Sequence, residues 1–120
     1  MKKVVLALLL IAPSLANAEK AAPNPADFTV KVHIKSSRLI YIGSGTDTQV
    51  VEDLMVLIAG KTYELTNAAP RNSVLRLGNY QAKIIEVKGQ TQRAYEDGTV
   101  YEFLLPDGST RNFYTAGEFE

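Results

Sequence analysis

The sequence predicts an all-β protein that folds as a single antiparallel β-sandwich of seven to eight strands. Three observations indicate this fold class. Apolar and polar residues alternate with a period of two along most of the chain after residue 26, which is typical of strands with one buried face. Turn residues separate these segments at intervals of roughly 8–12 residues. No long helical pattern and no internal repeat interrupts them.

The expected strands differ in how regularly they alternate. In residues 28–35 every second side chain is apolar, without exception. Tight turns are expected at Asp97-Gly98 and Asp107-Gly108, because glycine tolerates a positive φ and aspartate can accept a hydrogen bond within its own turn. The remaining expected strands cover residues 38–42, 50–58, 61–67, 79–87, 100–105 and 110–116.

Residues 50–58 admit two interpretations. In a helix, their apolar residues would recur at helical spacing and Gly60 would end the helix. In a strand, Leu54, Val56 and Ile58 would share one face, and the chain would turn within residues 59–61 into the next strand. The strand is favoured, because β-branched residues are frequent here and a clear strand pattern follows the short glycine turn.

The first 18 residues have the pattern of a secretory signal peptide. Lys2 and Lys3 precede an apolar run at residues 4–12, and the small residues Ala16 and Ala18 stand at the expected cleavage site. The apolar run is shorter than the roughly 20 residues that span a bilayer. We therefore expect export to the periplasm or beyond the cell, with no stable membrane anchor after cleavage. A buried N-terminal helix or an uncleaved anchor is the alternative.

Three regions are expected along the chain: the signal peptide at residues 1–18, a flexible leader with two prolines at 19–26, and one β-sandwich domain at 27–120. The chain has no cysteine, so this exported domain has to be stable through packing alone, without disulfides. Without Lys2 and Lys3, the 13 Lys and Arg fall to 11 against 13 Asp and Glu. Such a slightly acidic balance does not favour nucleic acid or an anionic membrane as a partner.

A short motif resembles part of known secreted modules. Leu75, Gly78 and Tyr80 form an L-x-x-G-x-Y pattern, which resembles that of transthyretin-like modules and collagen-binding-protein B-type repeats. In those modules a glycine turn leads a tyrosine into a strand, so the resemblance implies an Ig-like or transthyretin-like sandwich and transfers no site residues. Residues 101–111 also resemble the C-terminal hairpin of small secreted bacterial β-sandwich proteins of unassigned function.

Residues with catalytic chemistry are few and lack the partners that this chemistry needs. His33 is the only histidine and lies between Lys31 and Lys35 on the polar face of its strand, so it is interpreted as a solvated residue. Gly60-Lys61-Thr62 ends like a phosphate-binding loop, but Met55 stands where such a loop begins with glycine.

Two pairs of neighbouring carboxylates, Glu52/Asp53 and Glu96/Asp97, are candidate calcium ligands. Neither pair has the spacing of a calcium-binding loop, so both are interpreted as parts of solvated turns. Gly43-Ser44-Gly45 is likewise interpreted as a flexible turn. The sequence therefore predicts no catalytic residue, no cofactor and no metal site.

The tyrosines are the best candidates for a binding surface. The chain has six tyrosines against four phenylalanines, and tyrosine is favoured where one edge of a side chain stays wet. Most of the tyrosines fall on faces that are expected to be buried. Tyr95 and Tyr114 have mixed strand neighbours and are the predicted binding surface.

Three functions follow as hypotheses. The favoured one is a non-enzymatic binding or structural module of the cell envelope, whose partner is an envelope protein or a glycan. The first alternative is a small hydrolase or metal-dependent enzyme built on His33 and loop carboxylates. The second is a subunit of a larger envelope assembly that pairs through an exposed strand or through the face of Met55 and Leu57. The oligomeric state stays open.

Overall fold

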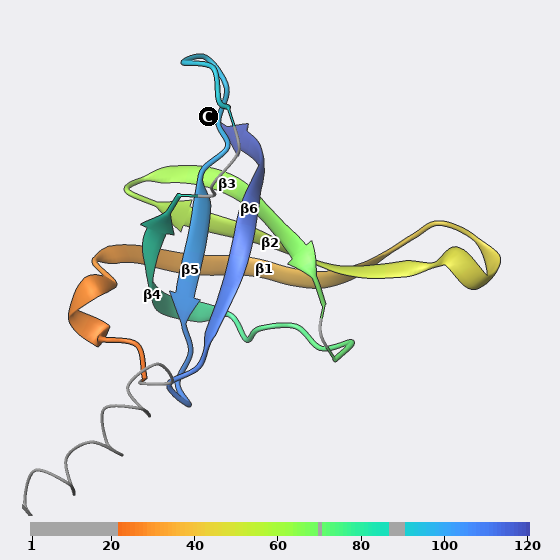
Figure 1. The fold of residues 1–120 in the computed structure, drawn as a ribbon, viewed down its shortest axis with the longest axis horizontal. Coiled ribbons are helices and arrows are strands. Elements are labelled where there is room, and N and C mark those ends of the chain that lie inside the picture. The colour runs from red at the N-terminus through yellow and green to blue at the C-terminus, as the bar shows by residue number, and fades with distance from the viewer. Residues whose placement is uncertain (1–21, 70, 87–90) are drawn as a thin grey trace, which may run out of the picture.

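The computed structural model describes residues 22–69, 71–86 and 91–120 and confirms an all-β fold (Figure 1). Two short 3-10 helices, η2 (Pro25–Asp27) and η3 (Gly45–Asp47), are the only helical elements in these ranges. None of the described helices is long and apolar enough to cross a membrane. The strands are β1 (Val30–Ile42), β2 (Gln49–Ile58), β3 (Lys61–Ala68), β4 (Gly78–Ile85), β5 (Val100–Leu104) and β6 (Thr110–Phe119).

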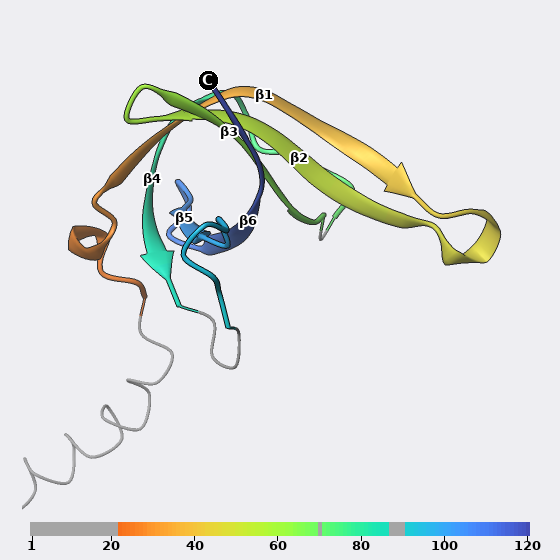
Figure 2. The ribbon, with the colours of Figure 1, turned by 90° about the horizontal axis from the view of Figure 1, so that it is seen from above.

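The six strands form one closed barrel, so the predicted β-sandwich, whether Ig-like or transthyretin-like, is wrong. Hydrogen-bonded neighbours follow the order β1-β2-β3-β6-β5-β4, and β4 pairs again with β1. The chain makes two three-stranded meanders, which the β3–β6 and β1–β4 pairs join edge to edge. Figure 2 shows β4, β5 and β6 curving away from the first meander and back to it. Because both meanders are joined along both edges, they cannot form two separate sheets.

The predicted number of strands is also wrong, and the reason lies in β1. The sequence pattern separates residues 28–35 from residues 38–42, but the structure joins them in one strand of 13 residues. The register with β2 shifts between Ile34 and Ser36. Lys35 therefore lies in a β-bulge, which bends a strand without ending it. Residues 50–58 lie in β2, which confirms the strand interpretation of that segment.

The interior of the barrel is filled with the apolar side chains that the period-two pattern predicts. Phe103 and Phe113 are fully buried, and their ring centroids are 5.0 Å apart. A barrel with this few strands encloses a space that side chains fill completely. The other members of the buried cluster are Val32, Ile34, Leu54, Val56, Ile58, Leu65, Ala82 and Tyr101.

The predicted Asp107-Gly108 turn is present, whereas the prediction of a tight turn at Asp97-Gly98 is wrong, because the turn of that connection lies at Ala94 and Tyr95 and Gly98 has no positive φ. Oδ1 of Asp97 accepts a hydrogen bond from the backbone N–H of Thr99, and Oδ1 of Asp107 accepts one from that of Ser109, each at 3.0 Å. In the Asp107-Gly108 turn, Gly108 has a φ of 86°, in the left-handed region that glycine adopts without strain. This turn joins β5 to β6.

The start of the domain is only partly covered by the structure. The predicted signal peptide, with Ala16 and Ala18, lies outside the described residues. Within the predicted leader, Pro25 begins η2, and Oδ1 of Asn24 accepts a hydrogen bond from the N–H of Ala26 at 3.1 Å. Phe28 follows this turn and is buried, so the 3-10 turn leads directly into the packed part of the chain.

The β1–β2 hairpin extends beyond the barrel as an arm, which we define as residues 38–51 (Figures 1 and 2). β4 pairs with β1 only over residues 30–34, whereas β2 accompanies β1 as far as Ile42. One edge of β1, at residues 36–42, therefore has no strand partner in the described part of the chain. Gly43 shapes the tip, because its φ is 100° and a Cβ there would lie 2.6 Å from the carbonyl oxygen of Asp47.

Candidate functional site

The arm carries apolar side chains on both of its faces. Tyr41 is paired with Val50 on one face, and Ile40 is paired with Val51 on the other. The side chain of Tyr41 is 66% exposed and that of Ile42 is 52% exposed. Clustered apolar side chains that stay exposed on a soluble protein mark a surface that binds a partner. The arm is therefore the candidate functional site.

The open edge of β1 adds unpaired backbone groups to this apolar surface. Residues 36–42 include no proline and no glycine, and Arg38 is their only charged residue. Proteins that stay monomeric protect such edges with prolines, lysines, bulges or very short strands. Here the bulge at Lys35 lies at the start of the edge and leaves the following seven residues regular. The edge can therefore accept a further strand.

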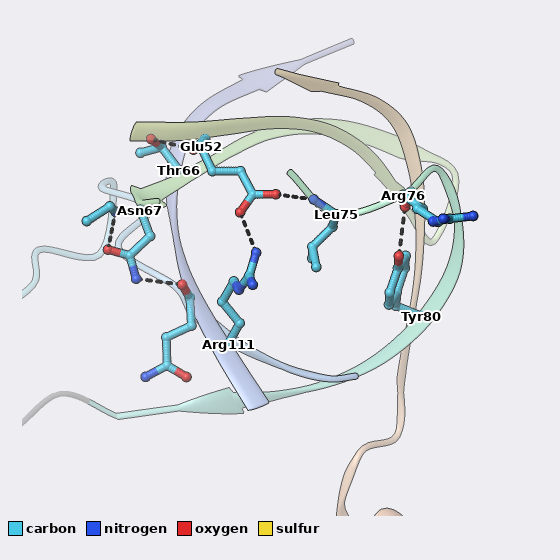
Figure 3. A network of polar contacts seen from close by, with 9 residues as sticks. Glu52, Thr66, Asn67, Leu75, Arg76, Tyr80 and Arg111 are labelled. Atoms are coloured by element: carbon cyan, nitrogen blue, oxygen red, sulfur yellow. Dashed lines mark hydrogen bonds and ion pairs between the residues drawn. The ribbon is translucent and has the colours of Figure 1, made fainter. Parts of the chain in front are cut away.

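A buried ion pair holds the base of the arm inside the barrel. Glu52 lies on β2 and is fully buried. Its Oε1 accepts a hydrogen bond from the guanidinium of Arg111 at 2.8 Å, and its Oε2 accepts one from the backbone N–H of Leu75 at 2.6 Å (Figure 3). Arg111 lies on β6 and Leu75 in the connection between β3 and β4. One carboxylate thus ties β2 to two segments that are distant in sequence.

Further hydrogen bonds hold β3 and β6 next to this ion pair. The hydroxyl of Thr66 donates to the backbone carbonyl of Glu52 at 3.1 Å, and Nδ2 of Asn67 donates to the carbonyl of Asn112 at 2.6 Å (Figure 3). Figure 3 also shows the hydroxyl of Tyr80 directed at the carbonyl of Arg76, to which it donates at 2.7 Å. These hydrogen bonds add to the ion pair of Glu52 and Arg111 in fixing β3 and β6 next to β2.

A second acidic residue, Asp53, holds the base of the arm on the opposite face of β2. Asp53 is buried, and its Oδ2 accepts a hydrogen bond from Nε of Arg38 at 3.1 Å. The carboxyl of Glu64 on β3 lies beside it. A hydrogen bond between these two carboxyls raises the pKa of Glu64, and burial and the negative charge of Asp53 add to the increase. Both faces of β2 are thus anchored by carboxylates where the arm leaves the barrel.

The prediction that Glu52 and Asp53 belong to a solvated turn is wrong. They are consecutive residues of a strand, so their side chains point to opposite faces, and each is buried by a different set of neighbours. The sequence does hold one signal for Glu52, since it stands two residues before Leu54 and in phase with Val56 and Ile58. It holds none for the partner, because Arg111 is 59 residues away.

The two predicted binding residues, Tyr95 and Tyr114, are both exposed but lie in different parts of the fold. Tyr95 is 79% exposed in the connection between β4 and β5, and its hydroxyl accepts a hydrogen bond from Arg93 at 2.9 Å. Tyr114 is 43% exposed on β6. Within the described chain, no hydrogen bond or ring contact joins them. Tyr41, which its strand pattern places among the core tyrosines, is the tyrosine that projects from the arm.

His33 lies on the outer face of the barrel and is exposed, as predicted. Its Nδ1 lies 2.7 Å from Oδ1 of Asn79, beside a groove of about 450 Å³. An amide carries no charge to stabilise a protonated imidazole, unlike the carboxylate of a catalytic triad. In the described ranges, no cluster of three or more His, Asp or Glu side chains is arranged to hold a metal ion. The groove is also lined by Lys31, Val32, Leu57, Ala59, Gly60 and Gln81.

Comparisons of the chain with protein-family models, curated proteins and solved structures found no match. The fold and the site themselves define the class of protein. It is a small, cysteine-free antiparallel β-barrel from which an anchored, apolar β-arm projects.

Replacing Glu52 with alanine should destabilise the fold strongly, because it leaves the guanidinium of Arg111 without its partner in a mostly buried place. We expect the free energy of unfolding to fall by about 3–5 kcal/mol in urea titrations. The exposed pair of Lys61 and Glu118 is the matched control, and Glu118→Gln should cost less than about 1 kcal/mol. Equal losses in the two variants would contradict a structural role for the buried pair.

The raised pKa of Glu64 predicts a pH-dependent stability. Protonated Glu64 stabilises the fold below its ordinary pKa of 4.5, and this contribution is lost as the pH rises through the raised pKa of the folded chain. Glu64→Gln removes this loss, so the stability of the variant relative to the wild type should increase as the pH rises above the ordinary pKa of 4.5, as measured by the free energy of unfolding.

The control for this pH dependence is Asp53→Asn, which removes the neighbouring charge. In a carbon-13 NMR titration of the carboxyl groups, the pKa of Glu64 should then fall back towards its ordinary value. A Glu64 carboxyl that titrates identically in both proteins would show that Asp53 is not the cause.

Proposed function

We propose that this protein is an exported, non-enzymatic interaction module that binds a protein partner through its arm. The observation that carries the proposal is the exposure of Tyr41 and Ile42 on a projecting hairpin, next to a seven-residue strand edge with which no described strand pairs. The enzymatic alternative has less support, since the imidazole of His33 contacts the amide of Asn79.

The chemistry of the arm favours a polypeptide over a glycan as the partner. An open strand edge presents a regular row of backbone donors and acceptors, which another strand matches along its whole length. The apolar side chains on both faces would pack against alternate side chains of that added strand. Glu52 and Asp53 hold the base of the arm before binding, so less conformational entropy is lost when the partner binds.

Export is part of the proposal and is supported by the signal-peptide pattern of residues 1–18. The absence of cysteine fits a domain that reaches its fold without disulfide formation. We place the folded protein in the periplasm or outside the cell.

Export can be tested by expressing the full chain in a bacterial host and measuring the intact mass of the product. We expect a periplasmic or secreted protein that begins at Glu19. Ala18→Leu should slow the cleavage, because the peptidase site admits only small side chains, whereas Ala18→Gly should be cleaved normally. A product that keeps residues 1–18 and stays in the cytoplasm would contradict export.

The binding role of the arm can be tested by replacing Tyr41 with a photo-crosslinking phenylalanine derivative in cells that express the full chain. Illumination should give a covalent adduct with another polypeptide. The matched control carries the same group at Tyr95, which is at least as exposed but lies away from the arm, and should give no adduct. Adducts at Tyr95 and none at Tyr41 would contradict the proposal that the arm binds the partner.

A further inference from the structure

We infer that the polypeptide which pairs with the open edge of β1 is a second copy of this chain. The inference rests on the proposed function of the arm and names its partner. Two identical edges can pair antiparallel about a two-fold axis, and the backbone donors and acceptors of each edge then bond those of the other. The result is a continuous sheet in which β2 and β1 of one copy are followed by β1 and β2 of the second copy.

The symmetry restricts the possible registers. A two-fold axis perpendicular to the sheet keeps equivalent faces on the same side, so it has to lie midway between the two copies of one residue of β1. An axis between the two copies of Arg38 would place two guanidinium groups opposite each other and is disfavoured. An axis at Ile40 instead places Leu39 opposite Tyr41 and Arg38 opposite Ile42. These pairs bury the most exposed apolar side chains of the arm.

The charges of the arm favour the same antiparallel arrangement. Asp47 is the only charged residue of the tip, and Lys35 and Arg38 lie near the base. When two arms pair antiparallel, the tip of each copy lies beside the base of the other, so Asp47 approaches basic side chains. The side chain of Arg38 does not obstruct the pairing of the two edges, because its Nε donates a hydrogen bond to Asp53 on the β2 side of the strand.

With the axis at Ile40, residues 38–42 of the two copies pair with one another, and these five residues span roughly 17 Å of strand, which is a modest interface. We therefore expect a dimer that forms reversibly, with a dissociation constant in the micromolar range. The test is sedimentation velocity of the product of the full chain, from about 1 μM to about 500 μM, a range that brackets such a constant. The expected result is a shift from monomer to dimer as the concentration rises.

Two lysine substitutions test whether dimerisation depends on the arm or on another part of the surface. Ile42→Lys places a charge on the open edge and opposite Arg38 of the other copy, and should weaken dimerisation by at least about tenfold. Ile84→Lys makes the same change on β4, at a side chain of similar exposure (59%), and should leave dimerisation unchanged. Thermal unfolding of both variants checks that the barrel is intact. A wild type that stays monomeric throughout, or a dimer that Ile42→Lys does not weaken, overturns the inference.

The lack of cysteine allows a second measurement that does not depend on destabilising the dimer. A single cysteine at Ile40 should form disulfide-linked dimers faster than a cysteine at Thr91, because facing Cα atoms in a non-hydrogen-bonded antiparallel pair are about 4.5 Å apart. Cysteines at Leu39 and Tyr41 should react more slowly than the one at Ile40, since their copies lie diagonally, roughly 7–8 Å apart. The fastest position identifies the residue on the axis. Rates no faster than that of Thr91→Cys overturn the inference.

Photo-crosslinking at Tyr41 distinguishes the two proposals. An adduct of twice the chain mass supports both of them. An adduct of any other mass would leave the interaction module standing and remove the second copy as its partner. Without any adduct at Tyr41, the arm itself loses its proposed function.

Discussion

The buried carboxylate of Glu52 is the interaction on which the architecture at the arm depends. It joins β2 to Arg111 on β6 and to the backbone of Leu75, and all three groups meet at the end of the barrel beneath the arm. A charge in this position is costly unless it is paired and hydrogen-bonded. Glu52 has an ion-pair partner in Arg111 and a hydrogen-bond donor in the backbone of Leu75, so the burial of its charge does not oppose folding. These contacts specify one arrangement of the two meanders.

Asp53 extends this control to the outer face of the same strand. Consecutive residues of β2 thus anchor the hairpin from both sides, through Arg111 inside the barrel and through Arg38 outside it. Beyond this point, among the described strands, the hairpin pairs only with itself and with the end of β3. An arm that is fixed at its base and apolar along its length is suited to binding another chain. The barrel then serves as the rigid support for the arm.

The period-two pattern predicted the strands and most of the core, because in a strand the phase of the apolar residues alone decides which face is buried. The pattern failed where residues distant in the sequence decided whether a side chain is buried or exposed. Tyr41 is in a good strand pattern, yet it is exposed, and β2 is the only described strand that pairs with that part of β1. Glu52 is acidic, yet it is buried because Arg111 reaches it. The candidate site was therefore missed, and the predicted pair of Tyr95 and Tyr114 lies elsewhere in the fold.

The sequence by itself determined the all-β class, the strand at residues 50–58 and the Asp107-Gly108 turn, since each of these depends on residues close together in the chain. Only the tertiary structure decided between a sandwich and a barrel, because closure depends on the β1–β4 and β3–β6 pairs between distant strands. The same holds for the arm. The arm is exposed because β4 stops pairing with β1 at Ile34. The pattern of residues 38–51 gives no indication of where that pairing stops.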